Sequence, residues 1–194
     1  MKDRTTILGI LLILFASLAT VAAAQETFTG TVYQYGSGRY TGLRTAGFTL
    51  RINSMTPDAQ AKRDLAMLQS GGQDALLKSI RNEDLGRFAL TGDIGRTINA
   101  VREVDNGRTR KIYVIFERWE QFAELRSGRR SLDYPFGYVE LTIDSRTGKG
   151  TGQYFAAAKI HWKNDKKSGA QVEIEDYATF PARLVEVRGS HARP

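Results

Sequence analysis

Arginines and aromatic residues gather in one polar segment, residues 118–137, of this 194-residue chain. Its candidate ligand-binding residues are Arg126, Arg129, Arg130, Tyr134 and Phe136. Guanidinium groups bind anions in a fork geometry and aromatic rings offer flat faces, so the pattern predicts a site for an acidic or sugar-like ligand. The structural alternative is a short helix over residues 120–126, a solvated basic turn and a Tyr-Pro-Phe plug that seals the core, because aromatic side chains mostly pack.

The two histidines do not form a metal-binding pattern. His161 alternates with Ile160 and Trp162 on an expected strand and should lie at the surface, and His191 belongs to the last residues of the chain. No second histidine stands near His161, and the helical His-Glu-x-x-His spacing of zinc enzymes does not occur. The sequence therefore predicts no metal site, no cofactor and no histidine-based catalysis.

Hydrolase signatures are equally weak. The Gly-x-Ser-x-Gly motif is absent, and the glycines of residues 36–42 join two expected strands, which favours loop flexibility over a phosphate cradle. Paired carboxylates could still perform acid and base chemistry without these motifs. The candidate acids form two groups along the chain, Glu173, Glu175 and Asp176, and Asp133, Glu140 and Asp144. Alternating acids on an exposed strand face are the commoner explanation, so no catalytic residue is predicted.

The N-terminal residues have the pattern of an export signal. Lys2 and Arg4 form a basic start, an apolar run follows from residue 7 to residue 21, and Ala22–Ala24 supply small side chains. This order is typical of a signal peptide, and cleavage is expected between Ala24 and Gln25. The alternative is a retained membrane anchor, but the apolar run is shorter than the roughly 20 residues that cross a bilayer.

Composition limits the chemistry further. The chain has no cysteine, which excludes disulfides, thiolate nucleophiles and lipid attachment to cysteine, so its stability must come from an ordinary core. Its net charge is +7, from 28 basic and 21 acidic residues. Such a balance suits an anionic ligand, a polysaccharide or an envelope component as partner, but the charges are scattered along the chain, which favours a role in solubility. Nucleic acid is not an expected partner outside the cytoplasm.

Short strands of alternating polarity dominate the rest of the chain. Phe48, Leu50 and Ile52 alternate with polar residues, as in a half-buried strand, whereas residues 112–116 are apolar throughout and are expected to be central. Nine strands are predicted, at residues 27–35, 48–53, 87–91, 98–104, 111–117, 138–144, 152–162, 171–177 and 182–188.

Turn residues between these strands favour antiparallel pairing. Asp105-Asn106-Gly107 is a strong hairpin signal because Asn and Gly accept positive φ angles, and residues 145–150 and 166–169 are looser versions. Most connections are too short for the crossover helix that parallel pairing needs. The predicted fold is α+β and mainly antiparallel β, with a meandering sheet or partly closed barrel of roughly eight or nine strands.

A helical pair is expected between the second and third strands. Thr56-Pro57-Asp58 offers a capping hydroxyl, a proline for the first helical position and an acid at the positive end of the helix dipole. The first helix would end at Gly71-Gly72, and residues 73–81 would form a second short helix. No repeat or linker interrupts the chain, so residues 25–188 are expected to form a single domain between the signal peptide (residues 1–24) and a flexible tail (residues 189–194).

Three strings carry a resemblance to other proteins. Residues 71–76 (Gly-Gly-Gln-Asp-Ala-Leu), 131–137 (Ser-Leu-Asp-Tyr-Pro-Phe-Gly) and 156–160 (Ala-Ala-Ala-Lys-Ile) follow a signal peptide in this order. The chain in this respect resembles a group of exported bacterial proteins with no assigned function. The resemblance implies a periplasmic or secreted setting, and it supplies no catalytic residues.

Three hypotheses of function follow. The first is a non-catalytic binding or envelope-associated domain, because a basic, aromatic loop accompanies a sheet without catalytic motifs. The second is a structural or protein-interaction module that uses a strand edge or an apolar patch. The third is a cofactor-free hydrolase with two carboxylates in one cleft. The oligomeric state is left open by the sequence.

Overall fold

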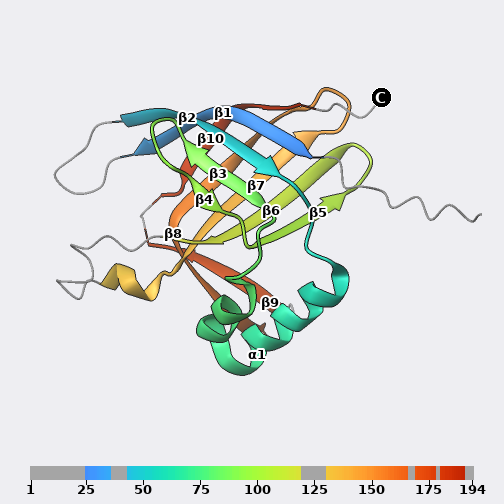
Figure 1. Cartoon of the computed structure of the whole chain (residues 1–194), viewed down its shortest axis with the longest axis vertical. Helices are drawn as coiled ribbons and strands as arrows, with labels where there is room; N and C mark the ends of the chain where they lie inside the picture. The colour runs from blue at the N-terminus through green and yellow to red at the C-terminus, as the bar shows by residue number, and fades with distance from the viewer. Residues whose placement is uncertain (1–24, 36–42, 119–129, 166–168, 178–179, 191–194) are drawn as a thin grey trace, which may run out of the picture.

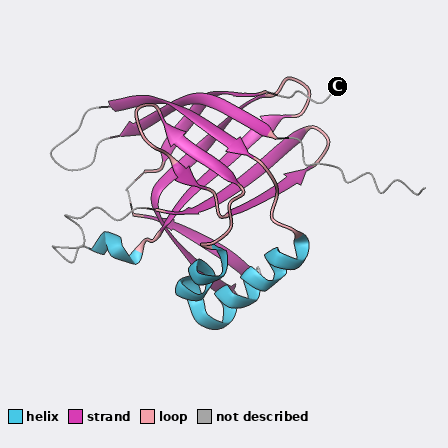
Figure 2. Cartoon of the chain, in the orientation of Figure 1, coloured by secondary structure: helices cyan, strands magenta, loops and turns pink. Residues whose placement is uncertain are grey.

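Ten antiparallel strands form one sheet that curls into a partly closed barrel, with one helical element below it (Figures 1 and 2). The computed structural model describes residues 25–35, 43–118, 130–165, 169–177 and 180–190. The elements are β1 (Glu26–Tyr35), β2 (Leu43–Ile52), α1 (Asp58–Ile80), β3 (Gly86–Leu90), β4 (Arg96–Thr97), β5 (Ala100–Asp105), β6 (Thr109–Glu117), η1 (Arg130–Asp133), β7 (Phe136–Asp144), β8 (Lys149–Asp165), β9 (Gly169–Asp176) and β10 (Ala182–Gly189). The predicted α+β, mainly antiparallel fold is confirmed.

The sheet closes on itself through the segment between β4 and β5. The strand order is β4-β3-β2-β1-β10-β8-β7-β6-β5, so these two consecutive strands stand at opposite ends of the sheet. Between them, the amide of Ile98 donates to the carbonyl of Gly86 (3.0 Å) and the amide of Asn99 donates to the carbonyl of Ile115 (2.9 Å). One short segment thereby bonds to β3 on one side and to β6 on the other, which protects part of two exposed sheet edges.

The interior of the barrel is filled by apolar side chains. The alternation in β2 is confirmed, because Phe48, Leu50 and Ile52 are at most 3% exposed. Phe88 lies at the centre of an aromatic cluster, with its ring centroid 5.5 Å from that of Phe116 and 5.0 Å from that of Tyr154. The barrel interior is thus a packed core.

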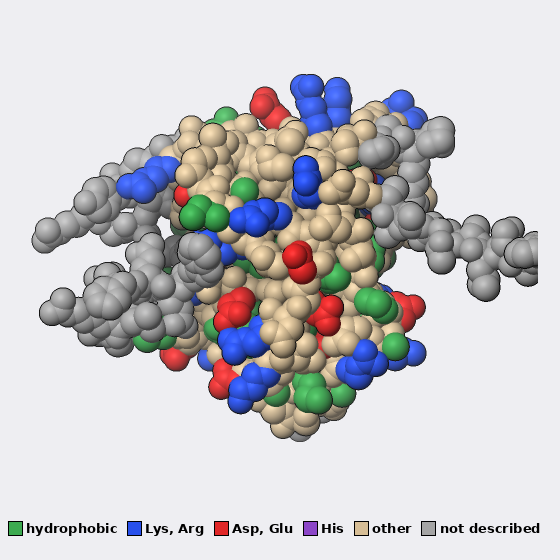
Figure 3. Space-filling view, in the orientation of Figure 1, with side chains coloured by type: hydrophobic (Ala, Val, Ile, Leu, Met, Phe, Trp, Pro, Cys, Tyr) green, Lys and Arg blue, Asp and Glu red, His purple; other side chains and the backbone are tan. Residues whose placement is uncertain are grey.

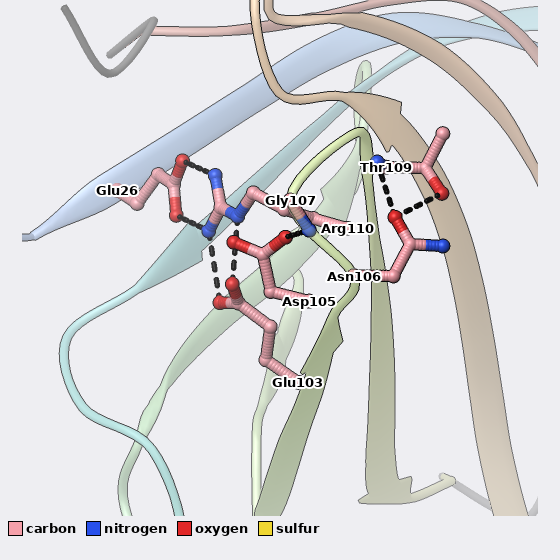
Figure 4. A network of polar contacts seen from close by, with 7 residues as sticks. All are labelled: Glu26, Glu103, Asp105, Asn106, Gly107, Thr109 and Arg110. Carbon is pink, nitrogen blue, oxygen red and sulfur yellow. Dashed lines mark hydrogen bonds and ion pairs between the residues drawn. The ribbon is translucent and has the colours of Figure 1, made fainter.

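One end of this interior is occupied by a buried ion-pair cluster (Figure 4). Arg110 of β6 is in the same inward row as Ile112, and its side chain is only 5% exposed. Its guanidinium binds both carboxylate oxygens of Glu26 at 2.7 Å and both oxygens of Glu103 at 2.7 and 2.9 Å. Because β10, β8 and β7 separate β1 from β6 in the sheet, the contact with Glu26 crosses the end of the barrel.

The second half of β8 leaves the barrel and forms a ribbon with β9. Residues 158–165 of β8 pair with β9, while residues 149–158 pair with β10 or β7. α1 packs against this ribbon and the outer face of the barrel, and a second core of Leu68, Leu76, Ile80 and their neighbours forms there. Tyr113 and Ile115 on the outer face of β6 pack against this core, which explains why residues 112–116 are apolar throughout.

The predicted helical pair appears as α1 with a break at Gly72. Gly72 has φ 70° and ψ −163°, a conformation that favours glycine and separates two helical halves. The predicted cap at Thr56 is wrong: α1 begins at Asp58, Pro57 is the N-cap, and no side chain caps the helix. The Thr56 hydroxyl instead accepts a hydrogen bond from the amide of Val101 (2.9 Å), because Thr56 lies beside β5.

The Asp105-Asn106-Gly107 hairpin is confirmed between β5 and β6. Gly107 has φ 83°, and the carboxylate of Asp105 accepts its amide at 2.7 Å. The Asn106 side-chain oxygen accepts the amide of Thr109 (2.8 Å), which fixes the start of β6. Among the described residues, no helix combines the length and apolar character needed to cross a membrane.

Candidate anion site beside the barrel closure

Four arginines line one cavity of about 720 Å³ next to the segment that closes the barrel. Arg81 follows the last turn of α1, Arg87 lies in β3, Arg96 in β4, and Arg118 directly follows β6. The remaining lining residues are Leu77, Gly95, Thr97, Asn99, Glu117 and Pro135. The cavity exists because closure of the sheet brings β4 beside the end of β6, and the C-terminal end of α1 reaches the same place.

Each of these guanidinium groups is held by a contact with the protein. Arg81 forms an ion pair with Glu117 (Nη2 to Oε1, 2.6 Å), and Arg87 donates to the carbonyl of Ile94 through Nε (3.0 Å) and Nη2. Arg96 donates to the carbonyl of Gly95 (3.2 Å), and Arg118 donates through Nε to the carbonyl of Tyr134. The carbonyl contacts orient these guanidinium groups without themselves neutralising their charge, whereas Glu117 pairs with Arg81.

Counted over the described residues that line it, the cavity has a formal excess of three positive charges. Four guanidinium groups face one carboxylate, that of Glu117, among its lining residues. On the face shown in Figure 3, both basic and acidic side chains lie on the described surface, with acidic ones mainly in its lower half. A concave site that concentrates one sign of charge attracts small ions of the opposite sign and loses that attraction as salt is added. The arrangement therefore suits an anion.

Tyr154 lies close to these charges, which affect the pKa of its hydroxyl. Burial raises the pKa of its hydroxyl to about 12, while the charges of Arg96 and Arg118 lower it and those of Asp93 and Asp176 raise it. The phenol is thus unionised at neutral pH. It supplies a neutral hydroxyl in the neighbourhood of two of the cavity arginines.

Asn99 uses its side-chain amide to hold the closure together. Its Nδ2 donates to the carbonyls of Arg81 (3.3 Å) and Glu83 (3.0 Å), and its Oδ1 accepts the amide of Glu117 (2.8 Å). Asn99 is only 4% exposed. It therefore ties the end of α1 to the end of β6 and fixes the distance between Arg81 and its neighbours across the cavity.

The structure separates the aromatic residues of the predicted ligand site from the cavity. Tyr134 is 4% exposed, its hydroxyl donates to Glu175, and its ring centroid lies 5.2 Å from that of Tyr177. Phe136 is fully buried in the core between α1 and the sheet. Both side chains pack, as the structural alternative expected.

The arginines of that predicted site cannot be placed. Arg126 and Arg129 lie outside the described residues, and Arg130 begins η1 with a side chain outside the described part. The two ends of the segment do reach the cavity, since Arg118 and Pro135 line it. A ligand role for Arg126, Arg129 and Arg130 stays a prediction.

Carboxylates that the sequence offered for acid and base chemistry have structural partners. Glu173 accepts Nε2 of His161 and Nζ of Lys163, both at 3.1 Å, and these two contacts, with Lys163 first, lower its pKa. Asp144 accepts the backbone amide and hydroxyl of Thr147, which stabilises the β7–β8 turn and lowers its own pKa. These contacts keep both carboxylates ionised and favour structural roles.

Sequence reasoning missed the four cavity arginines. Each is a single arginine at the end of a different element, and such positions are ordinary in solvated strands and helices. Only the closure of the sheet brings them together.

Among the described residues, no group of three His, Asp or Glu side chains is placed to hold a metal ion. No family model, curated protein or solved structure matches this chain.

Proposed function

We propose that this protein is an exported, non-catalytic binding domain whose ligand is an anionic small molecule or the acidic group of a polysaccharide. The observation that carries the proposal is the convergence of Arg81, Arg87, Arg96 and Arg118 on one cavity. The volume, about 720 Å³, is within the range of small-molecule pockets, roughly 300–1,000 Å³. It exceeds what an inorganic ion fills, which favours a ligand with a carboxylate or phosphate attached to a larger body.

Guanidinium groups select such ligands for a geometric reason. Their donors form a planar fork that matches two oxygens of a carboxylate or phosphate, and charge-assisted bonds of this kind are about twice as strong as neutral ones. Arg87 and Arg96 stand on adjacent strands, since Arg87 pairs with Thr97 in the β3–β4 register. In this register Arg96 shares a face with its partner Phe88 and Arg87 leaves the other face, and both residues line the cavity at the edge of the sheet.

The other two hypotheses receive less support. A hydrolase needs two acids facing each other in a cleft, whereas Glu117 is the one carboxylate among the described residues that line this cavity, and it is paired with Arg81. An interaction module would use an exposed strand edge, and the closing segment bonds to part of the edges of β3 and β6. The binding hypothesis is therefore preferred.

The test is ligand binding by variants that remove charge from the cavity. Titration calorimetry with oligogalacturonate and with a phosphorylated sugar should give saturable binding that weakens as salt is added. The double variant R87Q/R96Q should bind at least about tenfold more weakly, since two charged hydrogen-bonding groups are lost. R183Q/R188Q removes the same charge from exposed positions of β10 and serves as the matched control. Equal weakening by both pairs would reduce the effect to net charge and contradict a defined site.

Export is part of the proposal and has its own test. It rests on the signal-peptide pattern of residues 1–24, which lie outside the described residues. Cell fractionation should find the protein in the periplasm or the medium, and N-terminal sequencing should begin at Gln25. Recovery of the intact precursor from the cytosol would contradict it.

A further inference from the structure

A second cavity, of about 450 Å³, lies between α1 and the outer face of the sheet. We call it the helix groove. Its apolar lining comes from both halves of α1 and from β5, β6, β8 and β9, and consists of Ala61, Leu65, Leu68, Leu76, Ile80, Ala100, Ile115, Ile160 and Val172. The groove is separate from the arginine cavity, with which it shares no lining residue.

The groove has a buried floor and an exposed apolar rim. Ile80, Ile160 and Leu68 are at most 2% exposed, while Leu65 and Val172 at the rim are 44% and 41% exposed. Figure 3 shows hydrophobic side chains among charged ones at the bottom of the view, where α1 lies. Apolar side chains that remain exposed at the mouth of an apolar cavity are a feature of binding sites.

Small residues create the space. Ala61 on the first half of α1 and Ala100 at the start of β5 line the groove, where larger side chains would fill it. The break at Gly72 and a hydrogen bond between the two helical halves, from the Ser79 hydroxyl to Asp64 (2.7 Å), hold the helix in this arrangement. The cavity is thus built into the packing of α1.

The charged groups at the groove are balanced within the protein. Arg102 donates to the carboxylate of Asp58 (2.8 Å) and to the carbonyl of Thr56 (3.0 Å). The carboxylate of Asp64, 7% exposed, accepts bonds from Gln60 (2.8 Å) and Ser79. With Lys62, the described residues of the lining include two cations and two anions, so their formal charge sums to zero. A charged ligand would gain no net attraction here, whereas an apolar one gains from the walls.

We infer that the helix groove binds a small, uncharged and largely apolar molecule, of the size of a medium-length acyl chain or a fused ring system. The apolar walls supply the binding free energy through burial of the ligand surface, at roughly 25 cal/mol per Å². The neutral rim excludes charged competitors, because desolvating a charge without a partner is costly. This inference does not depend on the proposed anion site.

A second copy of the chain is the main competing occupant. The volume of the groove, about 450 Å³, lies within the range of small-molecule pockets and favours a small molecule over a flat partner surface. The test therefore includes the oligomeric state.

The experiment uses N-phenyl-1-naphthylamine, an uncharged probe whose fluorescence rises in apolar surroundings, with purified protein. Saturable binding with one probe per monomer is expected. A61W places a large ring in the groove and should weaken binding at least about tenfold. A66W adds the same ring at an exposed position of the same helix and should bind within about twofold of the parent. R87Q/R96Q should also bind as the parent does, which separates this site from the anion site.

Each other outcome overturns the inference. Absence of saturable binding would contradict the groove as a binding site, and equal binding by A61W and A66W would contradict it as well. Sedimentation that shows a dimer which dissociates when the probe binds would assign the groove to a second copy. If A61W fails to fold by circular dichroism, L65Q decides, because Leu65 is exposed at the rim; its binding should fall about threefold, and unchanged binding would refute the site.

Discussion

Of the charged side chains that the structure describes, we expect Arg110 to be the one whose removal destabilises the protein most. Its side chain is 5% exposed, and its two partners, Glu26 and Glu103, have side chains 12% and 16% exposed. In R110M both carboxylates stay near the end of the barrel core without the cation that compensates them. The hydrogen bonds that Arg110 donates to Glu26 and Glu103, in this order of effect, raise its pKa above the ordinary value, so it remains charged over the whole accessible pH range.

The expected magnitude follows from the burial of the cluster. Breaking a buried ion pair by removing one partner costs about 3–5 kcal/mol, since the other charge is left uncompensated. A domain of this kind has a total stability of about 5–15 kcal/mol, so R110M should lose a large share of it. The partial exposure of the two glutamates lets water reach them and places the cost near the lower end of the range.

Urea unfolding followed by tryptophan fluorescence and circular dichroism measures the effect. K111M is the matched control, because Lys111 is the next residue on β6, its side chain is half exposed, and its amine lies 3.8 Å from Glu140. Loss of that exposed pair should cost less than about 1 kcal/mol. The two variants remove the same charge from adjacent positions that face opposite sides of the strand.

A triple variant distinguishes loss of compensation from loss of packing. E26Q/E103L/R110M replaces the whole cluster by uncharged side chains and should recover most of the stability, as replacements of buried ion clusters often do. The reasoning is refuted if R110M lies within about 1 kcal/mol of the parent. It is equally refuted if the triple variant is as unstable as R110M, since the cost would then not come from uncompensated carboxylates.

Three further substitutions test the fold. Gly137→Ala would place a Cβ 2.0 Å from the ring of Phe116, so unfolding in urea should show a loss of at least about 1–3 kcal/mol from overpacking. Thr56→Val removes the acceptor of a buried β5 amide and should cost about 1–3 kcal/mol, with helical circular dichroism unchanged because Thr56 does not cap α1; a selective loss of helix would contradict this role. Asp144→Ala should lower Tm at pH 7, and the difference should shrink in acid. The turn contacts, with the backbone amide of Thr147 first, lower the pKa of Asp144 in the folded state. The stabilisation is therefore present above the unfolded-state pKa of 3.8 and is lost as pH falls through the lower folded-state pKa. A Tm difference that is the same at pH 7 and pH 2 would exclude a contribution from the carboxylate charge.

Local patterns predicted the strands because the side-chain period reports burial directly. Each of the nine predicted strands corresponds to a strand of the structure, and the hairpin at residues 105–107 forms where its Asn and Gly allow it. β4 was missed because it has only two residues, too few for any alternation to show. The break at Gly72 was predicted from two adjacent glycines, whereas the role of Thr56 was not, since its partner is 45 residues away.

Long-range charge pairing is what the sequence could not reveal. Arg110 lies between Thr109 and Lys111, a polar run that suggests a solvated strand start, and its partner Glu26 is 84 residues away. The cavity arginines are hidden for the same reason, because they belong to four elements that meet only when the sheet curls. The sequence predicts Tyr134 and Phe136 as ligand-binding residues because they lie near arginines along the chain, but both side chains pack in the core.

Both proposed sites depend on the helical insertion between β2 and β3. The barrel interior is filled by side chains and one of its ends is closed by the Arg110 cluster, so the interior of this barrel does not serve as a ligand cavity in the way that larger barrels do. Binding sites then have to form where α1 meets the outside of the sheet. Leu77 and Arg81 line the arginine cavity, while Leu76 and Ile80, one position earlier in each case, line the helix groove. Successive helical residues point about 100° apart, so two neighbouring faces of the same helical segment line the proposed anion site and the proposed apolar site.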